Sequence, residues 1–81
     1  MMKIKIKENV AELYIAENMD LDGNYYGNAK WESFLWELAG KLLEVVNYDL
    51  LGSTFDTKPI KGLTSKGFTI PKEYIQEVIY N

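Results

Sequence analysis

Polar and apolar residues alternate strictly at the start of the chain, from Met2 to Lys7. Ile4 and Ile6 fall on one face and lysines on the other, which is the period of a half-buried β-strand. Lysines along one face suit the solvated edge of a sheet, where charge blocks unwanted pairing. The next run, Val10 to Ala16, is rich in β-forming residues. We therefore predict that Glu8-Asn9 turns the chain and that a hairpin opens the fold.

The middle of the chain predicts a loop followed by a long helix. Residues from Glu17 to Asn28 include many Asn, Asp and Gly, which favour turns. From Ala29 to Asn47 apolar residues recur at helical spacing. They form one stripe, made of Trp31, Phe34, Leu35, Leu38, Leu42, Val45 and Val46. We predict one helix over this whole range, with Asn28 as its N-cap.

Two more apolar residues widen the apolar face of that helix. Trp36 and Leu43 lie seven positions apart and extend the face over more than half of the circumference. A helix that covers one sheet needs a narrower stripe. Another element or another chain is therefore expected to cover this flank, and Trp36 and Leu43 are candidate partner-binding residues.

Short strands and a second helix are predicted for the rest of the chain. Tyr48 to Phe55 has the composition of a strand, and Ile60–Thr64 and Gly67–Ile70 are two shorter candidates. Pro71 suits the first position of a helix. The predicted fold is a single α+β domain, residues 1–81. A small antiparallel sheet of three to five strands is packed by one long helix, with a short C-terminal helix, in the order ββ-α-β(ββ)-α.

The composition argues against catalysis. The 81 residues include no histidine, no cysteine and no arginine. Histidine is the usual general base and cysteine the easily activated nucleophile, so their absence excludes Ser-His-Asp and Cys-His arrangements and His- or Cys-ligated zinc. Paired carboxylates stay open, since glycoside hydrolysis needs only two, but no acid pair stands out. We expect a protein that is not an enzyme and uses no cofactor.

The composition also bears on location, origin and partners. A chain without cysteine forms no disulfides, which favours the reducing cytoplasm, and no apolar run is long enough for a membrane span. All nine cations are lysines, a bias typical of AT-rich genomes such as those of low-GC bacteria, their phages and their plasmids. The formal net charge of −3 argues against general affinity for nucleic acid.

The predicted loop holds the best metal-like cluster. Asp20, Asp22 and Asn24 have the spacing of the first, third and fifth ligands of a calcium loop. That motif also needs Gly at its sixth position and Glu at its twelfth, where this chain has Tyr25 and Trp31. We therefore prefer an Asx-rich turn and expect no metal.

Aromatic and acidic residues supply further candidates for partner binding. Tyr25 and Tyr26 follow the Asx-rich cluster, and tyrosine is enriched in interface hot spots. Two consecutive tyrosines do not easily both point inward, so packing on the core and contact with a partner are both open. Glu32, Glu37 and Glu44 form an acidic stripe on the predicted helix. The stripe is either an ordinary charged face or a mimic of phosphates in a basic nuclease groove.

Tyr14-Ile15-Ala16 is followed by an Asx-rich loop, by Gly23-Asn24-Tyr25-Tyr26-Gly27 and by Trp31. With a one-residue gap before Gly23, this stretch resembles the opening of ArdA-type antirestriction proteins, which begin with a strand reading Tyr-aliphatic-Ala, a loop, Gly-x-x-x-Gly and a Trp. The resemblance covers residues 14–31. It implies a mobile-element protein that inhibits DNA-defence enzymes by acidic mimicry, here a shorter and less acidic relative of that family.

These observations predict a small non-catalytic binding or inhibitor protein of a phage or mobile element. It would occlude a protein partner such as a host defence nuclease. Two alternatives stay open. One is a small nucleic-acid-binding regulator that uses the lysine-rich strand edge. The other is a homo-oligomeric structural protein, whose dimer contact would be Trp36 and Leu43.

Overall fold

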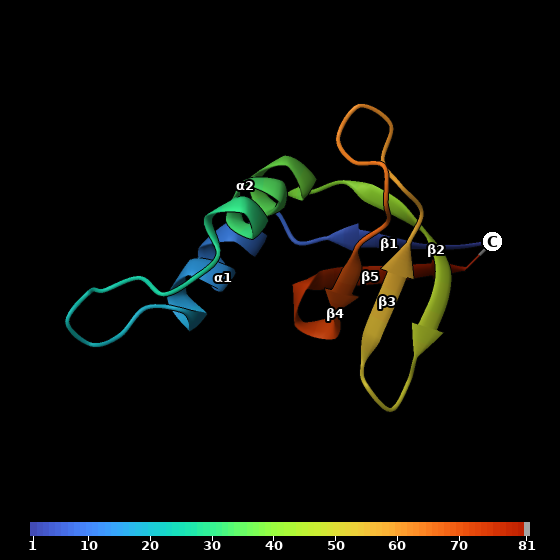
Figure 1. Ribbon diagram of the computed structural model, residues 1–81. Coiled ribbons are helices and arrows are strands. Elements are labelled where there is room, and N and C mark those ends of the chain that lie inside the picture. The colour runs from blue at the N-terminus through green and yellow to red at the C-terminus, as the bar shows by residue number, and fades with distance from the viewer. Residues whose placement is uncertain (81) are drawn as a thin grey trace.

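The computed structural model describes residues 1–80 and contains a five-stranded antiparallel sheet and two α-helices (Figure 1). The elements in chain order are β1 (Met2–Ile6), α1 (Val10–Glu17), α2 (Ala29–Leu38), β2 (Leu42–Asp49), β3 (Thr54–Thr57), β4 (Thr69–Pro71), the 3₁₀ turn η1 (Lys72–Tyr74) and β5 (Ile75–Tyr80). The predicted α+β class and antiparallel sheet are confirmed, but the predicted element order is wrong. The domain was predicted to end at Asn81, which lies outside the described residues.

The strand order in the sheet is β4-β3-β2-β1-β5, so the first and the last described strands are neighbours. The strand predicted at the N-terminus is present, and Ile4 and Ile6 are fully buried. It is not an edge, however, because β2 and β5 flank it. Its lysines are accommodated by carboxylates on neighbouring strands: Lys3 lies opposite Glu44, and Lys5 lies opposite Glu77. Such opposite-charge pairs stabilise neighbouring strands.

The segment predicted as the second strand is helix α1, so the chain does not open with a hairpin. Val10 is fully buried, and Leu13 and Tyr14 pack against the core. Residues three and four apart share one face of a helix, so this short segment buries one side against α2 and the sheet. An apolar run of this length fits a helix or a strand, and the packing decides between them.

The predicted long helix ends at Leu38, about halfway along its predicted range. Gly40 has a φ of +74°, a left-handed conformation that stops a helix and costs glycine little. From Leu42 onward the residues of the predicted helix form β2, which pairs with β1 and β3. Its β-branched Val45 and Val46 suit a strand. The predicted N-cap is confirmed, since the Asn28 Oδ1 accepts a hydrogen bond of 2.8 Å from the Trp31 backbone N–H.

The C-terminal half also differs from prediction. The range Tyr48–Phe55 is interrupted by a turn between β2 and β3, and Ile60–Thr64 forms a turn rather than a strand. Gly67–Ile70 leads into β4, as expected of a short strand. The helix predicted from Pro71 is limited to η1, after which the chain extends as β5. β1 supplies the backbone hydrogen-bond partners of β5. The apolar spacing within β5 fits a helix and does not reveal this pairing.

The hydrophobic core lies where the helices meet the sheet. Its fully buried large side chains are Ile4, Ile6, Val10, Leu35, Leu38 and Ile70. Phe68 adds an aromatic contact, with ring centroids 5.7 Å from Trp31 and 5.3 Å from Phe34. The helices therefore sit at one end of the molecule, and the loop between them projects away from the sheet (Figure 1). No helix within residues 1–80 has the length and apolar character needed to cross a membrane.

Candidate partner-binding surface

The projecting loop, residues 18–28 and here named the arm, is organised around one carboxylate. The Asp20 Oδ1 accepts hydrogen bonds of 2.9 Å from the backbone N–H groups of Asp22 and Asn24. Its Oδ2 accepts from the Asn24 side-chain amide and from the Tyr26 hydroxyl, both at 3.2 Å. The bond from the Asn24 backbone N–H is the main reason that the pKa of Asp20 lies below its usual 3.8. One side chain thus fixes the conformation of the arm.

Backbone pairing turns the arm into a short hairpin anchored at its base. Met19 and Tyr25 form an antiparallel bridge, and the Tyr26 backbone N–H donates to the Asn18 carbonyl at 2.7 Å. Both ends of the arm bind Tyr14 on α1. The Asn18 amide donates to its carbonyl oxygen, and the Asn28 backbone N–H donates to its hydroxyl, each at 2.8 Å. The arm is therefore pre-organised.

The metal-like residues take part in this hairpin. The two oxygens of Asp20 already accept from four donors, three of them on Asp22 and Asn24. Within the part of the chain that the structure describes, no group of three or more His, Cys, Asp or Glu could hold a metal ion. The arrangement is that of an Asx-rich turn.

The two tyrosines of the arm diverge. Tyr26 is 72% exposed, whereas Tyr25 is half-buried and lies so close to Gly27 that a Cβ on that glycine would overlap the phenol ring. Burial, followed by the effect of the Glu32 carboxylate, raises the pKa of Tyr25 to about 12. Leu21 at the tip is fully exposed and Met19 is 43% exposed. The arm thus presents apolar and aromatic side chains to solvent on a fixed frame.

The structure separates Trp36 from Leu43. Trp36 on α2 is 49% exposed, and its Nε1 donates a hydrogen bond of 3.1 Å to the Glu32 Oε2. Leu43 lies on β2 opposite Ile4 and is 5% exposed, so it belongs to the core. The expectation that both residues widen one helix flank is wrong, because the helix ends before Leu43.

The predicted glutamate stripe is divided in the same way. Glu32 and Glu37 lie on α2, whereas Glu44 lies on β2. The Glu44 carboxylate forms an ion pair of 2.7 Å with the Lys58 Nζ, and this lysine is the main reason that the pKa of Glu44 is lowered. Glu44 therefore faces a cation of its own chain and does not extend the acidic face of α2.

The negative charge of the chain is concentrated in its helical part. Residues 8–38, which comprise α1, the arm and α2, carry a net charge of −6, while the whole chain carries −3. The carboxylates of this part are Glu8, Glu12, Glu17, Asp20, Asp22, Glu32 and Glu37. All of them are exposed except Glu32, which is half-buried. We call this part the acidic end; the rest of the chain carries a net charge of +3. A count of charge along the sequence could have revealed it, but only the helical assignment of residues 10–17 groups these residues in space.

Comparison with known proteins gives no match: no family model fits this chain, and neither the curated proteins nor the solved structures include a significant relative. The resemblance to ArdA-type proteins therefore stays a prediction from residues 14–31. Within that stretch, Tyr14-Ile15-Ala16 lies in α1 and not in a strand.

Proposed function

We propose that this protein is a small non-catalytic inhibitor that occludes a basic surface of a protein partner, with the acidic end as its contact. The separation of charge carries this proposal, because six net negative charges gather on the helical end of an 81-residue chain. Charge complementarity of this kind directs binding toward partners that themselves bind nucleic acid. A defence nuclease of the host of a phage or plasmid is the partner class that we favour.

The arm supports the proposal because hydrogen bonds hold its conformation and because it is partly apolar. Side chains held in place before binding lose less conformational entropy on association. Tyr26 and Leu21 are exposed on this frame. Leu21 lies between Asp20 and Asp22 in the sequence, and the Tyr26 hydroxyl donates a hydrogen bond to Asp20. Aromatic anchors inside a polar rim are typical of interface hot spots. The arm would supply the anchors, and the carboxylates of α1 and α2 would supply the charge.

The structure also bears on the two alternatives. The nucleic-acid regulator depends on a lysine-rich strand edge, but Lys3 and Lys5 lie on an inner strand opposite carboxylates. The oligomer depends on a shared flank of Trp36 and Leu43, which the fold separates. The acidic end therefore remains the best-supported contact surface.

The test uses immobilised protein and lysate of a low-GC bacterial host, followed by mass spectrometry and binding assays with each purified candidate. The decisive variant combines Glu12→Lys with Glu37→Lys, two exposed positions on separate helices. We expect it to lose the partner, and we expect a second variant, Tyr26→Ala, to weaken binding at least tenfold. Leu51→Ser is the matched control, since Leu51 is fully exposed but lies in the β2–β3 turn.

Two results would contradict the proposal. One is a purified partner that binds the charge-reversed variant as tightly as the wild type. The other is a partner that binds the acidic end but whose DNA cleavage is unchanged by saturating protein. The second result would retain the binding surface and remove the inhibitory function.

A further inference from the structure

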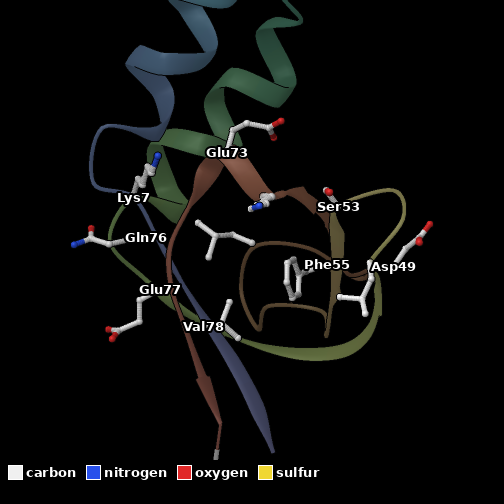
Figure 2. Close-up of a pocket in the computed structure, with 11 residues that line it drawn as sticks. Lys7, Asp49, Ser53, Phe55, Glu73, Gln76, Glu77 and Val78 are labelled. Atoms are coloured by element: carbon white, nitrogen blue, oxygen red, sulfur yellow. The ribbon is translucent and has the colours of Figure 1, made fainter.

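The sheet leaves an open cavity along its last strand. β5 pairs with β1 on one side and, among residues 1–80, has no strand on its other side. On that side a cavity of about 810 Å³ lies between β5 and the β2–β3 hairpin (Figure 2). We call it the slot. Its volume falls within the range of ligand-binding pockets.

The inner surface of the slot is apolar and its rim is charged. Phe55, Ile75 and Val78 are half-buried and line the interior, as Figure 2 shows for Phe55 and Val78. The rim carries three carboxylates and two lysines. They are Asp49, Glu73, Glu77, Lys7 and Lys72. The three rim carboxylates can pair with cations that an occupant brings.

The backbone of β5 determines the shape of a suitable occupant. In an antiparallel strand, the N–H and C=O groups of successive residues point alternately to the two sides. The groups of β5 that point away from β1 therefore face the slot without a strand partner among the described residues. An unpaired edge is a template for an added strand. An extended backbone satisfies these groups, whereas a compact small molecule does not.

The β2–β3 hairpin forms the wall of the slot opposite β5. The turn of the β2–β3 hairpin is fixed by Asp49, whose Oδ1 accepts hydrogen bonds of 3.0 Å from the Leu51 and Gly52 backbone N–H groups. At its other end the slot is bounded by η1, which joins β4 directly to β5. β5, the hairpin and η1 thus bound the slot on three sides, and β5 of a second copy would bring Glu77 and no cation.

We propose that the slot binds an extended segment of a protein partner, with alternating apolar and basic side chains, as a sixth strand beside β5. β1 already pairs with β5 and illustrates which side chains suit a neighbour of this strand. It places Ile4 opposite Val78 and Lys5 opposite Glu77. An equivalent segment in the slot places apolar side chains against Phe55 and Val78 and cations near the rim carboxylates. This site is separate from the acidic end and does not depend on the proposed inhibition.

The test uses a labelled peptide with the sequence of residues 2–7, Met-Lys-Ile-Lys-Ile-Lys. A peptide of the same composition in block order, Lys-Lys-Lys-Met-Ile-Ile, cannot alternate along a strand. Titration by fluorescence anisotropy is expected to give saturable binding of the first peptide and at least tenfold weaker binding of the second. Equal binding of the two peptides, or no binding of the first, would overturn the proposal.

Variants of the protein locate the site. Val78→Lys puts a cation inside the slot and is expected to weaken binding at least tenfold, whereas Val46→Lys, on an exposed position of β2 outside the slot, is expected to leave it unchanged. If circular dichroism shows that Val78→Lys is unfolded, Glu73→Lys on the exposed rim replaces it, with an expected loss of at least threefold. Unchanged binding to a folded slot variant would place the peptide elsewhere and overturn the proposal.

Amide hydrogen exchange supplies an independent readout. Saturating peptide is expected to slow exchange at least tenfold at the β5 amides that do not pair with β1, with no change in β1. Loss of protection in β1 would mean that the peptide displaces that strand, which overturns the proposal. A second outcome would also overturn the proposal: light scattering shows a dimer, and the β5 amides that do not pair with β1 are protected without peptide. The occupant of the slot would then be a second copy of this chain.

Discussion

The Tyr74 hydroxyl donates a hydrogen bond of 3.2 Å to the Glu17 carboxylate and so joins η1 to the last residue of α1. The two residues lie 57 positions apart in the sequence. Tyr74 is 5% exposed, so its ring is packed in the core while its hydroxyl reaches the helix. This contact ties the acidic end to the 3₁₀ turn that leads into β5.

Replacing Tyr74 with Phe removes this hydrogen bond and retains the ring. We expect the free energy of unfolding to fall by about 1 kcal/mol, the usual contribution of one hydrogen bond. Urea denaturation at neutral pH measures the change. Tyr80→Phe is the control, since Tyr80 is 73% exposed and its substitution is expected to have almost no effect. Equal effects of the two substitutions would show that the Tyr74 hydroxyl does not stabilise the fold.

The same residue predicts a loss of stability in alkali. Burial, followed by the Glu17 carboxylate, raises the pKa of Tyr74 from 10.0 to about 12. The folded state therefore favours the protonated phenol. This contribution to stability is complete below pH 10 and is lost as the pH rises through the folded pKa near 12. Thermal unfolding across this range is expected to show a shallower decline in Tyr74→Phe than in the wild type. Tyr25, whose pKa is raised as well, is expected to contribute to the decline that remains in this variant.

Gly40 is expected to resist substitution because it ends α2. Alanine at a φ of +74° costs about 1–2 kcal/mol. Its Cβ would also lie 3.2 Å from the Glu8 Cγ. Gly62 has a φ of +85° and no neighbouring atom within 4 Å of an added Cβ, so Gly62→Ala isolates the backbone strain. Chemical denaturation should show that both variants are less stable, with Gly40→Ala at least as affected. A Gly40→Ala variant as stable as the wild type would contradict the conclusion that the left-handed conformation of Gly40 ends α2.

Thr57 is the buried polar residue that holds the segment before β4. Its Oγ1 accepts a hydrogen bond of 3.0 Å from the Phe68 backbone N–H. Thr57→Val keeps the volume but leaves that buried donor unpaired, which is expected to cost about 1–3 kcal/mol. Thr57→Ser keeps the acceptor and loses a methyl group, so the two variants separate hydrogen bonding from packing. A valine variant more stable than the serine variant would assign the role of Thr57 to packing alone.

Asp20→Ala is expected to loosen the arm without unfolding the protein. The substitution removes the acceptor for the backbone N–H groups of Asp22 and Asn24. Hydrogen exchange at these two amides should accelerate, while the thermal midpoint stays close to that of the wild type. Asp22→Ala is the matched control, since it removes an equal charge and retains the Asp20 acceptor. Because the pKa of Asp20 is lowered below 3.8, the arm should stay ordered at that pH and loosen as the pH falls through the lowered value.

Local signals in the sequence predict part of this fold. The strict alternation from Met2 to Lys7 predicts β1, and Asn28 before an apolar stripe predicts the start of α2. The turn residues around Asp20 predict the arm as a loop. Each of these features depends on neighbours within a few positions, which is the range over which sequence patterns carry information.

The predictions from sequence fail where pairing between strands that are far apart in the sequence determines the structure. The residues of β2 fit a helical stripe as well as a strand, and pairing with β1 and β3 selects the strand. Gly40 is the local signal that the prediction overlooked. Pro71 suits a helix start, but pairing with β1 extends the chain that follows it. These errors placed Leu43 and Glu44 on a helix and so misassigned two of the candidate binding residues.

The uneven distribution of charge has a kinetic consequence. The molecule measures 44 × 29 × 19 Å, with the negative helical part at one end and the net positive sheet at the other. Such a molecule has a permanent electric dipole moment. In the field of the basic partner proposed above, it is expected to rotate during diffusion so that the arm meets the partner first, which raises the fraction of productive encounters. The association rate constant should therefore fall steeply as salt is added, while the dissociation rate constant changes little.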